Sequence, residues 1–413
     1  MILSEKKVII SPSTSKPPLF HYTTFIKSIR IVDICNSIKR FLKLRRPIKL
    51  ESFEKNQQSM VVTQEIFKML MNQTSLKYLD FDFYTRTNYI NIPFINYPGG
   101  EDCLRDLSEL KCNSNIYPEF FYKLSRICHN LRLLKIIIED NDLNGLIELV
   151  SVQKHIKYLE LIFHDYLTDN RQLFTKFPDT LTKLRISGGR YRIPWSHISE
   201  LSNLKELSLF LFNKIGDLKY FKNLQHAVFP QLQVLTFGYE CPDDEYLTKF
   251  LENNGKNLKE LGLCENIDVS LNLKLGKYCP NLRSLCTAFH GDIVPLKGIF
   301  NGCQQLERLE ILRCEFLLDE RELLEIVVEF SPKKFYELSI DLGVHIYSET
   351  FQWGLRSILE RWANRVPCIP LSLSFASCSE LDIELSKSNI KMIEKFKKLG
   401  VIKEFKISNV GYD

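Results

Sequence analysis

Few residues of this sequence have the type and spacing that catalysis or metal binding requires. Cys128 and His129 are the one adjacent pair of cysteine and histidine, and such a pair could supply a nucleophile or two metal ligands. A cysteine buried in the core of a repeated unit accounts for the same residue, and this interpretation is favoured. Lys256 follows Gly255, but the upstream glycine of a phosphate-binding loop is missing, so Gly255 is expected to end a helix.

The other reactive residue types form no constellation. The eight histidines lack metal-ligand spacing, and no Gly-x-Ser-x-Gly, His-Glu-x-x-His or kinase motif is present. The 12 cysteines include no Cys-x-x-Cys pair, which is typical of reduced thiols inside a cell. We therefore expect no catalytic residue, no metal and no cofactor, and the sequence predicts that the protein is not an enzyme.

The composition is that of an ordered chain. Of 413 residues, 45% are hydrophobic and 25% are charged, which excludes a collagen-like or wholly disordered polymer. The net charge of +5 is too small to indicate a dedicated nucleic-acid-binding domain. The start of the chain lacks the apolar core of a secretory signal, and no apolar run approaches a membrane span. We expect a cytoplasmic protein, with a nuclear one as the alternative, and no membrane or nucleic-acid partner.

A short pattern, apolar-x-x-Leu-x-apolar, recurs along the chain and indicates the structural elements that must position any functional residues. Its first positions are Leu76, Leu107, Leu131, Ile156, Leu181, Leu204, Leu232, Leu258, Leu282, Leu306, Phe335, Cys368 and Ile402. Most intervals fall within the period of about 20 to 29 residues of leucine-rich repeats. The last two apolar positions alternate as in a short strand, and the first lies at the turn before it, so all three face one core.

One such unit cannot bury its apolar face alone, so neighbouring units must stack. Stacking predicts an α/β fold, a right-handed leucine-rich-repeat solenoid with a curved parallel sheet inside and helices outside. We expect residues 1–18 to be disordered, residues 19–70 to form a helical linker or cap, and residues 71–413 to form a solenoid of about 13 units. Asp243 and Asp244 are placed to begin one helix, and Gly400 is placed to end the last one.

Two segments outside the repeat pattern carry further expectations. The first of two helices within residues 20–70 is expected to place four apolar side chains on one face, namely Tyr22, Phe25, Ile26 and Ile29. Residues 89–100 contain two prolines and a Gly-Gly pair, which predict an aromatic loop. This loop can fold over an edge of the solenoid or contact a partner, and the sequence leaves both open.

Cysteines mark several repeat boundaries. Cys128, Cys279 and Cys303 each stand three residues before the first leucine of a unit, where a small thiol suits the tight turn into the strand. Cys314 follows Ile311 by three residues. This placement resembles the cysteine-containing repeats of F-box/leucine-rich-repeat proteins, and residues 17–25 are similar to the linker that follows the F-box in a fungal F-box-like family.

In that family an N-terminal F-box docks on the adaptor subunit of a cullin-RING (SCF) ubiquitin ligase, and the repeats hold the substrate for ubiquitin-dependent degradation. The resemblance implies a non-catalytic protein-binding module that recognises substrates for such a ligase. No F-box start precedes the linker in this chain, so we expect an adaptor partner only if an F-box lies upstream. The alternative is a free-standing scaffold or decoy that is not coupled to a ligase.

The concave sheet face is where a protein substrate is expected, because its side chains are not needed by the core. The partner-binding candidates on this face are Leu133, Lys135, Ile137, Tyr158, Glu160, Ile162, Lys183, Arg185, Glu206 and Phe210. Their apolar members are expected to form a strip rimmed by the charged ones, which a partner would cover with a gain of about 25 cal/mol per Å². β-propensity alone, or cover by the chain's own loops, is the alternative.

The segment Lys39–Arg46 is strongly basic. A nuclear import signal or a contact with an anionic surface would use it, and a solvated helix face explains it without function.

Overall fold

The structure is a computed structural model. The residues that it describes are 22–45, 52–81, 93–117, 119–139, 142–164, 171–188, 193–211, 221–264, 269–289, 293–312, 320–341, 349–377 and 387–409. The chain divides into two compact units, Met1–Pro194 and Trp195–Asp413. Residues 1–18, expected to be disordered, and Cys314 lie outside the described residues.

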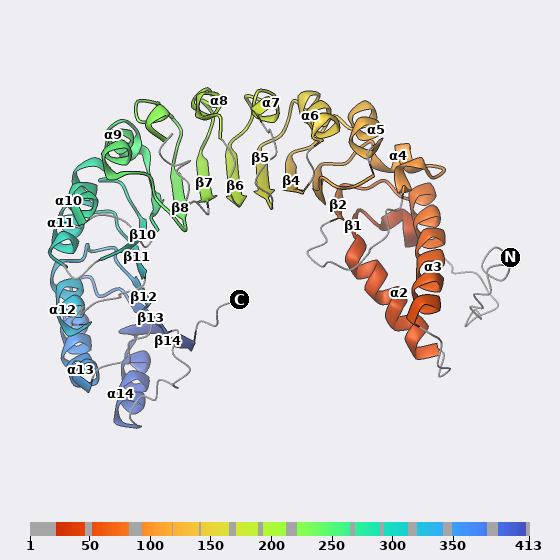
Figure 1. Cartoon of the computed structure of the whole chain (residues 1–413). Helices are drawn as coiled ribbons and strands as arrows, with labels where there is room; N and C mark the ends of the chain where they lie inside the picture. The colour runs from red at the N-terminus through yellow and green to blue at the C-terminus, as the bar shows by residue number, and fades with distance from the viewer. Residues whose placement is uncertain are drawn as a thin grey trace. The chain divides into compact units, whose positions relative to one another are not determined.

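The first unit alternates strands with helices. Its elements are η1 (Tyr22–Phe25), β1 (Ser28–Arg30), α2 (Ile31–Arg45), α3 (Ser52–Gln73), β2 (Tyr78–Phe81), η2 (Phe94–Asn96), α4 (Gly100–Leu104), β3 (Glu109–Asn113), α5 (Glu119–Ile127), β4 (Leu133–Ile138), α6 (Asn144–Ser151), β5 (Tyr158–Phe163), α7 (Arg171–Phe174) and β6 (Lys183–Gly188). The strands pair in parallel and in chain order. Figure 1 shows α4 to α7 of this unit along one side of the strands.

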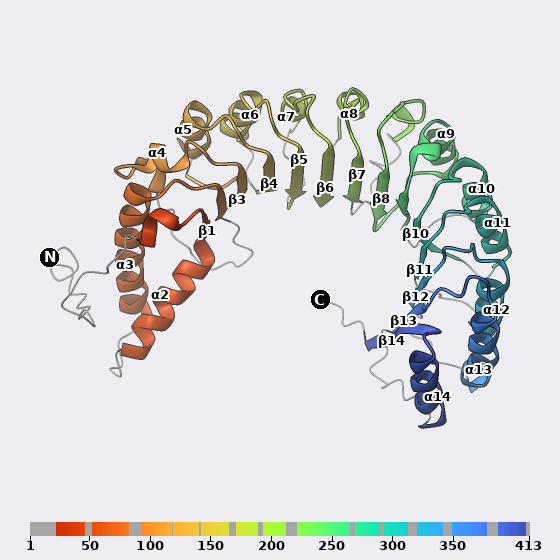
Figure 2. The same ribbon diagram turned by 180° about the vertical axis from the view of Figure 1, so that it is seen from behind.

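The second unit continues the same alternation. Its elements are α8 (Trp195–Ser199), β7 (Glu206–Leu211), β8 (Val234–Gly238), α9 (Asp244–Asn254), η4 (Gly255–Asn257), β9 (Glu260–Gly262), α10 (Val269–Tyr278), β10 (Ser284–Ala288), α11 (Val294–Gly302), β11 (Arg308–Leu312), α12 (Glu320–Phe330), β12 (Glu337–Asp341), α13 (Glu349–Ala363), β13 (Leu371–Ser377), α14 (Lys387–Lys398) and β14 (Ile402–Asn409). These strands are also parallel neighbours in chain order. Figure 2 shows α9 to α13 along one side of them.

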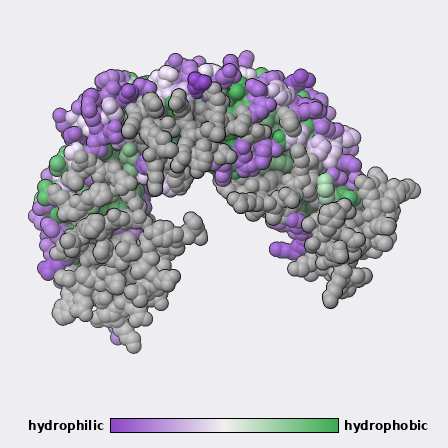
Figure 3. Space-filling view, in the orientation of Figure 1, coloured by the Kyte–Doolittle hydropathy of each residue, from purple (hydrophilic) through white to green (hydrophobic). Residues whose placement is uncertain are grey.

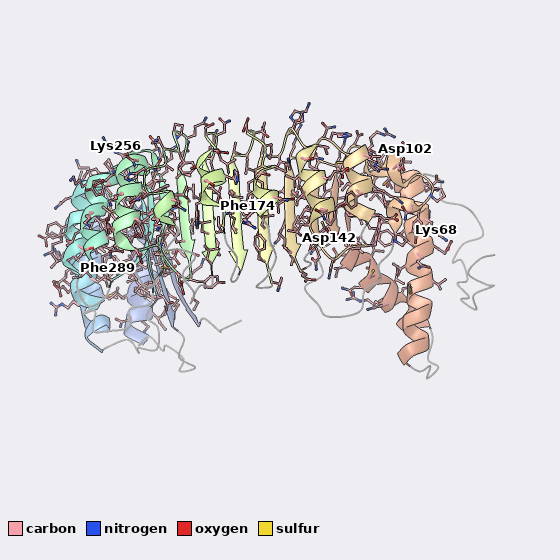
Figure 4. All side chains as sticks on the ribbon, turned by 45° about the horizontal axis from the view of Figure 1, so that its top comes forward. Lys68, Asp102, Asp142, Phe174, Lys256 and Phe289 are labelled. Carbon is pink, nitrogen blue, oxygen red and sulfur yellow. The ribbon has the colours of Figure 1, made fainter. Side chains whose placement is uncertain are left out.

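The core of each unit lies between the strands and the helices. The strand leucines that the repeat pattern identifies stack in register, as in Leu110, Leu134 and Leu159, and each of these three is fully buried. From the helix side, α5 contributes Phe120 and Leu124, both fully buried. Figure 4 shows side chains filling the space between the two layers, with the buried Phe174 and Phe289 labelled. The predicted α/β leucine-rich-repeat solenoid is confirmed as the fold class.

The turns between units explain the boundary cysteines. Cys128 Sγ donates a hydrogen bond to the carbonyl oxygen of Leu107 at 3.4 Å, and Cys303 Sγ donates to that of Cys279 at 3.3 Å. Both thiols are fully buried, so a larger side chain would displace the neighbouring turn. Buried amides act in the same turns, since Gln153 accepts from the backbone N–H of Leu131 at 3.0 Å and donates to the carbonyl oxygen of Cys128 at 2.7 Å.

The N-terminal part of the first unit differs from the expectation. The predicted helix with Tyr22, Phe25, Ile26 and Ile29 on one face is wrong, because residues 22–25 form the short helix η1 and residues 28–30 form β1. Ile29 pairs with Leu79, so β1 supplies the backbone groups that the edge of β2 would otherwise leave unpaired. β1 therefore precedes the thirteen strands that the repeat pattern predicted. The following helix α2 lies within the segment that was expected to be helical, and α3 begins within it and ends three residues beyond it, at Gln73.

The frame of one degenerate repeat is also corrected. Cys368 was assigned to a buried first position, but it is exposed. The sheet register places Leu373 beside Leu338 and Phe375 beside Ile340, so the strand residues lie two positions later than the pattern suggested. The spacing alone allowed both frames, because Leu371 and Leu373 are both apolar.

The described part of the aromatic segment, residues 93–100, folds onto the core of the first unit. The ring of Phe94 is fully buried, and its centroid lies 5.4 Å from that of Phe81 and 5.6 Å from that of Phe120. Gly99 has φ +79°, and a Cβ on Gly100 would lie 2.7 Å from the carbonyl oxygen of Ile95. The Gly-Gly pair thus allows the chain to turn directly from this aromatic cluster into α4.

Two predicted helix ends have different physical causes. Gly400 follows α14 with φ +71°, which is the left-handed geometry that ends many helices. Gly255 follows α9 with φ −61°, and a Cβ there would lie 2.5 Å from the carbonyl oxygen of Tyr278. Glycine at 255 is therefore required by the close approach of the next repeat. At its other end α9 begins at Asp244, with Asp243 at the N-cap position as expected, but no side-chain hydrogen bond caps the helix there.

Candidate functional site

The cysteine and histidine pair forms no reactive site. Burial raises the pKa of Cys128 to about 11, so its thiol stays protonated near neutral pH. Its neighbour His129 is exposed, and the Cys128 thiol donates its hydrogen bond to the backbone carbonyl of Leu107 and not to His129. Across the described ranges, no group of three or more His, Cys, Asp or Glu side chains is arranged to hold a metal ion. No helix in the described part of the chain is both long and apolar enough to cross a membrane.

The side of the strands that faces away from the helices, here called the sheet face, carries the predicted partner-binding residues. In the first unit the register forms three rows across β4, β5 and β6. The outer rows are Leu133, Tyr158 and Lys183 on one side, and Ile137, Ile162 and Ser187 on the other. The middle row is Lys135, Glu160 and Arg185.

The middle row is a chain of ion pairs. Lys135 Nζ lies 3.7 Å from Glu160 Oε1, and Arg185 Nε lies 3.5 Å from the same oxygen. Tyr158 donates a hydrogen bond from its hydroxyl to Glu160 Oε2 at 2.8 Å. Only 12% of the Glu160 side chain is exposed, so this carboxylate organises its three neighbours. The expected apolar strip with a charged rim is therefore wrong in its arrangement, because charges run through the middle.

One member of the expected strip is not available at the surface. Ile137 is 1% exposed, whereas Leu133, Tyr158 and Ile162 are half-buried. The pairing of Tyr158 with Glu160 recurs at Tyr78 and Asp80, whose hydroxyl-to-carboxylate distance is 2.8 Å. Burial, followed by the Asp80 carboxylate, raises the pKa of Tyr78 to about 12, so the hydroxyl remains a donor.

The two remaining candidates, Glu206 and Phe210, lie on β7 in the second unit. Phe210 is half-buried, and its ring lies over Gly238 of the next strand. Beside it the sheet face is hollowed into a cavity of about 650 Å³, called the second-unit hollow here. The lining residues are Phe210, Thr236, Phe237, Gly238, Tyr239, Glu260, Leu261, Gly262, Leu263, Cys264, Ser284, Cys286, Glu310 and Leu312.

The second-unit hollow was missed by the sequence analysis, although the sequence carries a signal for it. The middle row of this sheet face begins Ser208, Thr236, Gly262 and Cys286, which are short side chains. In the first unit the same row carries long charged side chains. Comparing the fifth position of successive repeats would have indicated a depression in the sheet face.

The basic segment Lys39–Arg46 begins inside α2, where Arg40 is exposed and Lys39 is half-buried. Its side chains from residue 43 onward lie outside the described residues.

The helical side of the molecule is mainly hydrophilic where Figure 3 shows it, with scattered hydrophobic residues.

Comparison with solved structures finds distant likenesses to this chain. Solved structures that resemble the chain include a leucine-rich-repeat protein of Leptospira interrogans, with 13% identity, a TM-score of 0.39, and coverage of 84% of this chain and 87% of that one. Another is TLR13 in the TLR13–ssRNA13 complex, with 14% identity, a TM-score of 0.35, and coverage of 84% of this chain and 61% of that one. No family model matches the chain. No curated protein matches it either.

Proposed function

We propose that the chain is a non-catalytic protein-binding module whose sheet face holds a protein substrate. The observation that carries this proposal is the sheet face of the first unit, where Tyr158 and Ile162 stay half-buried beside the Glu160 ion pairs. Apolar groups next to pre-arranged charges suit a protein surface, because burial supplies affinity and the charges supply orientation. The core uses neither set of side chains.

We further propose that the module serves as the substrate-recognition part of an F-box-type ubiquitin ligase receptor. The thiol-to-carbonyl hydrogen bonds of Cys128 and Cys303 support the resemblance to cysteine-containing repeats. Coupling to a ligase then depends on an F-box. Copurification of the full-length gene product with adaptor and cullin subunits tests this step, and their absence would favour the free-standing scaffold or decoy.

The binding surface is tested by quantitative capture of proteins on the immobilised chain, with Tyr158→Ser compared with the wild type. We expect the variant to lose the specifically captured proteins, because it removes both the ring and the hydrogen bond to Glu160. Tyr122→Ser on α5 is the matched control, since Tyr122 is also half-buried but lies on a helix. Equal capture by wild type and both variants would count against this surface.

A further inference from the structure

The second-unit hollow has an aromatic wall on one side. The ring centroids of Phe210 and Tyr239 lie 6.3 Å apart at an interplanar angle of 76°. Tyr239 is 55% exposed and has φ +68°, the one positive φ of a non-glycine residue in the described ranges. A left-handed tyrosine costs about 1 kcal/mol or more, so holding this ring at the rim of a cavity indicates use of the ring.

The floor of the hollow is made by short side chains and backbone. A Cβ on Gly238 would overlap the ring of Phe210, so glycine at this position leaves room for the ring to lie over β8. Gly262 lies next to Thr236 on one side and Cys286 on the other. Burial, followed by the Glu310 carboxylate, raises the pKa of the Cys286 thiol, which therefore stays neutral and unreactive in this floor.

Carboxylates line the side opposite the aromatic rings. Glu310 of β11 lies beside Cys286 of β10, and Glu260 of β9 lines the same cavity. Arg308 Nη2 approaches Glu260 Oε1 at 3.4 Å, but both side chains are about half exposed, at 42% and 50%. Such an exposed ion pair is weak, so the Glu260 carboxylate can also pair with a cation that enters the hollow.

The two units differ in the charge that their sheet faces carry. In the second unit the described sheet-face residues include six acidic side chains, Glu206, Glu260, Glu310, Glu337, Asp341 and Glu404, and two basic ones, Arg308 and Lys406. In the first unit the basic side chains outnumber the acidic ones, with Arg30, Lys111, Lys135, Lys183 and Arg185 against Asp80, Glu109 and Glu160. The hollow thus lies in an acidic face of a chain whose net charge is +5.

We propose that the second-unit hollow binds an arginine side chain carried by an extended segment of a partner protein. The planar guanidinium stacks on the exposed ring of Tyr239, beside the Phe210 ring, and pairs with Glu310, because arginine combines aromatic stacking with carboxylate pairing. This inference rests on the proposed protein-binding function and specifies the chemistry of one part of its partner. Nucleic acid is disfavoured here, since its phosphates would meet the acidic face.

The size of the site fits this occupant. From β7 to β11 there are four strand spacings of about 4.8 Å, or roughly 19 Å. An extended chain covers that distance with about six residues at 3.3 Å per residue. One or two arginine side chains of such a segment can therefore enter the hollow while its backbone crosses the strands.

The test is fluorescence anisotropy of the full-length protein with a labelled peptide, Gly-Arg-Gly-Arg-Gly-Arg. A second peptide contains citrulline in place of arginine, which keeps the shape and removes the charge. We expect the arginine peptide to bind about tenfold more tightly at low salt and to weaken as salt is added. Equal binding of the two peptides overturns the inference.

Variants locate the binding. Glu310→Gln and Tyr239→Gly are each expected to weaken the arginine peptide about two- to fivefold, through loss of an ion pair and of an aromatic contact. Tyr239→Gly keeps the fold because glycine tolerates φ +68°. The control is Glu109→Gln on the first-unit sheet face, expected to change binding less than twofold. Equal weakening by Glu109→Gln and Glu310→Gln overturns the assignment to the hollow.

The inference and the proposed function fail in distinguishable ways. If the arginine peptide does not bind while protein capture still depends on Tyr158, the inference is wrong and the proposed function stands. If the wild type captures no protein in a Tyr158-dependent manner, the proposed function is overturned whatever the peptide does.

Discussion

Replacement of Asn254 by alanine should strongly destabilise the second unit. Asn254 is 1% exposed and joins two successive repeats through its amide. Its Oδ1 accepts from the backbone N–H of Phe229 at 2.7 Å, and its Nδ2 donates to the carbonyl oxygen of Ala227 at 2.8 Å. Nδ2 also donates to the carbonyl oxygen of Phe250 at 3.0 Å.

The magnitude follows from the groups that alanine would leave unsatisfied. The N–H of Phe229 and the carbonyl of Ala227 would lose their amide partner in a buried turn, at about 1 to 3 kcal/mol for each group. The carbonyl of Phe250 lies within α9 and is therefore less affected. Allowing for partial relaxation, the local opening free energy should fall by about 2 to 4 kcal/mol.

Native-state hydrogen exchange measures this loss directly, without assuming that 413 residues unfold in one step. The Phe229 amide should exchange about 30 to 700 times faster in Asn254→Ala, since each 1.4 kcal/mol is a factor of ten. Asn253→Ala is the control, because Asn253 is exposed and its Nδ2 lies 3.4 Å from the carbonyl oxygen of Gln225. If both variants accelerate exchange equally, the buried amide bridge is not what stabilises this turn.

Two further predictions concern glycines and thiols. Gly298→Ala in α11 should raise the urea midpoint, because no atom beyond the adjoining helix backbone lies within 4 Å of the new Cβ and alanine is favoured in a helix by about 0.5 to 1 kcal/mol. Gly400→Ala should lower the free energy of unfolding by about 1 kcal/mol, and the urea midpoint with it, because φ is +71° although space for a Cβ is open. A shift of the midpoint in the same direction for both variants would contradict this reasoning. Stability should also fall in alkaline solution, because burial raises the pKa of Cys128 to about 11 in the folded state. The stability that the protonated, buried thiol contributes is complete below the pKa of the unfolded state and is lost as pH rises through the folded-state pKa. Cys128→Ser should reduce the fall in urea midpoint between pH 8 and pH 10, and an unchanged fall would exclude this thiol as a cause.

The repeat pattern predicted the architecture because burial is periodic. A leucine that must be buried in every unit, such as Leu134 or Leu159, leaves a local signal that needs no tertiary information. β1 left no such signal, since it is a three-residue strand in which Ile29 alone is buried. The frame of β13 was lost for a related reason, because neighbouring apolar residues satisfied the pattern in two ways and only pairing with β12 distinguishes them.

For the candidate site, the sequence by itself determined which side chains stand on the sheet face, because alternation along a strand assigns them one by one. The tertiary structure decided how they combine. Register brought Lys135 and Arg185 to the same Glu160 oxygen and set Phe210 over Gly238, and these contacts join residues about 25 or more positions apart. The lengths of side chains on neighbouring strands decide whether a sheet face is filled by ion pairs or hollowed. This comparison exists only between stacked repeats, so a single repeat does not reveal it.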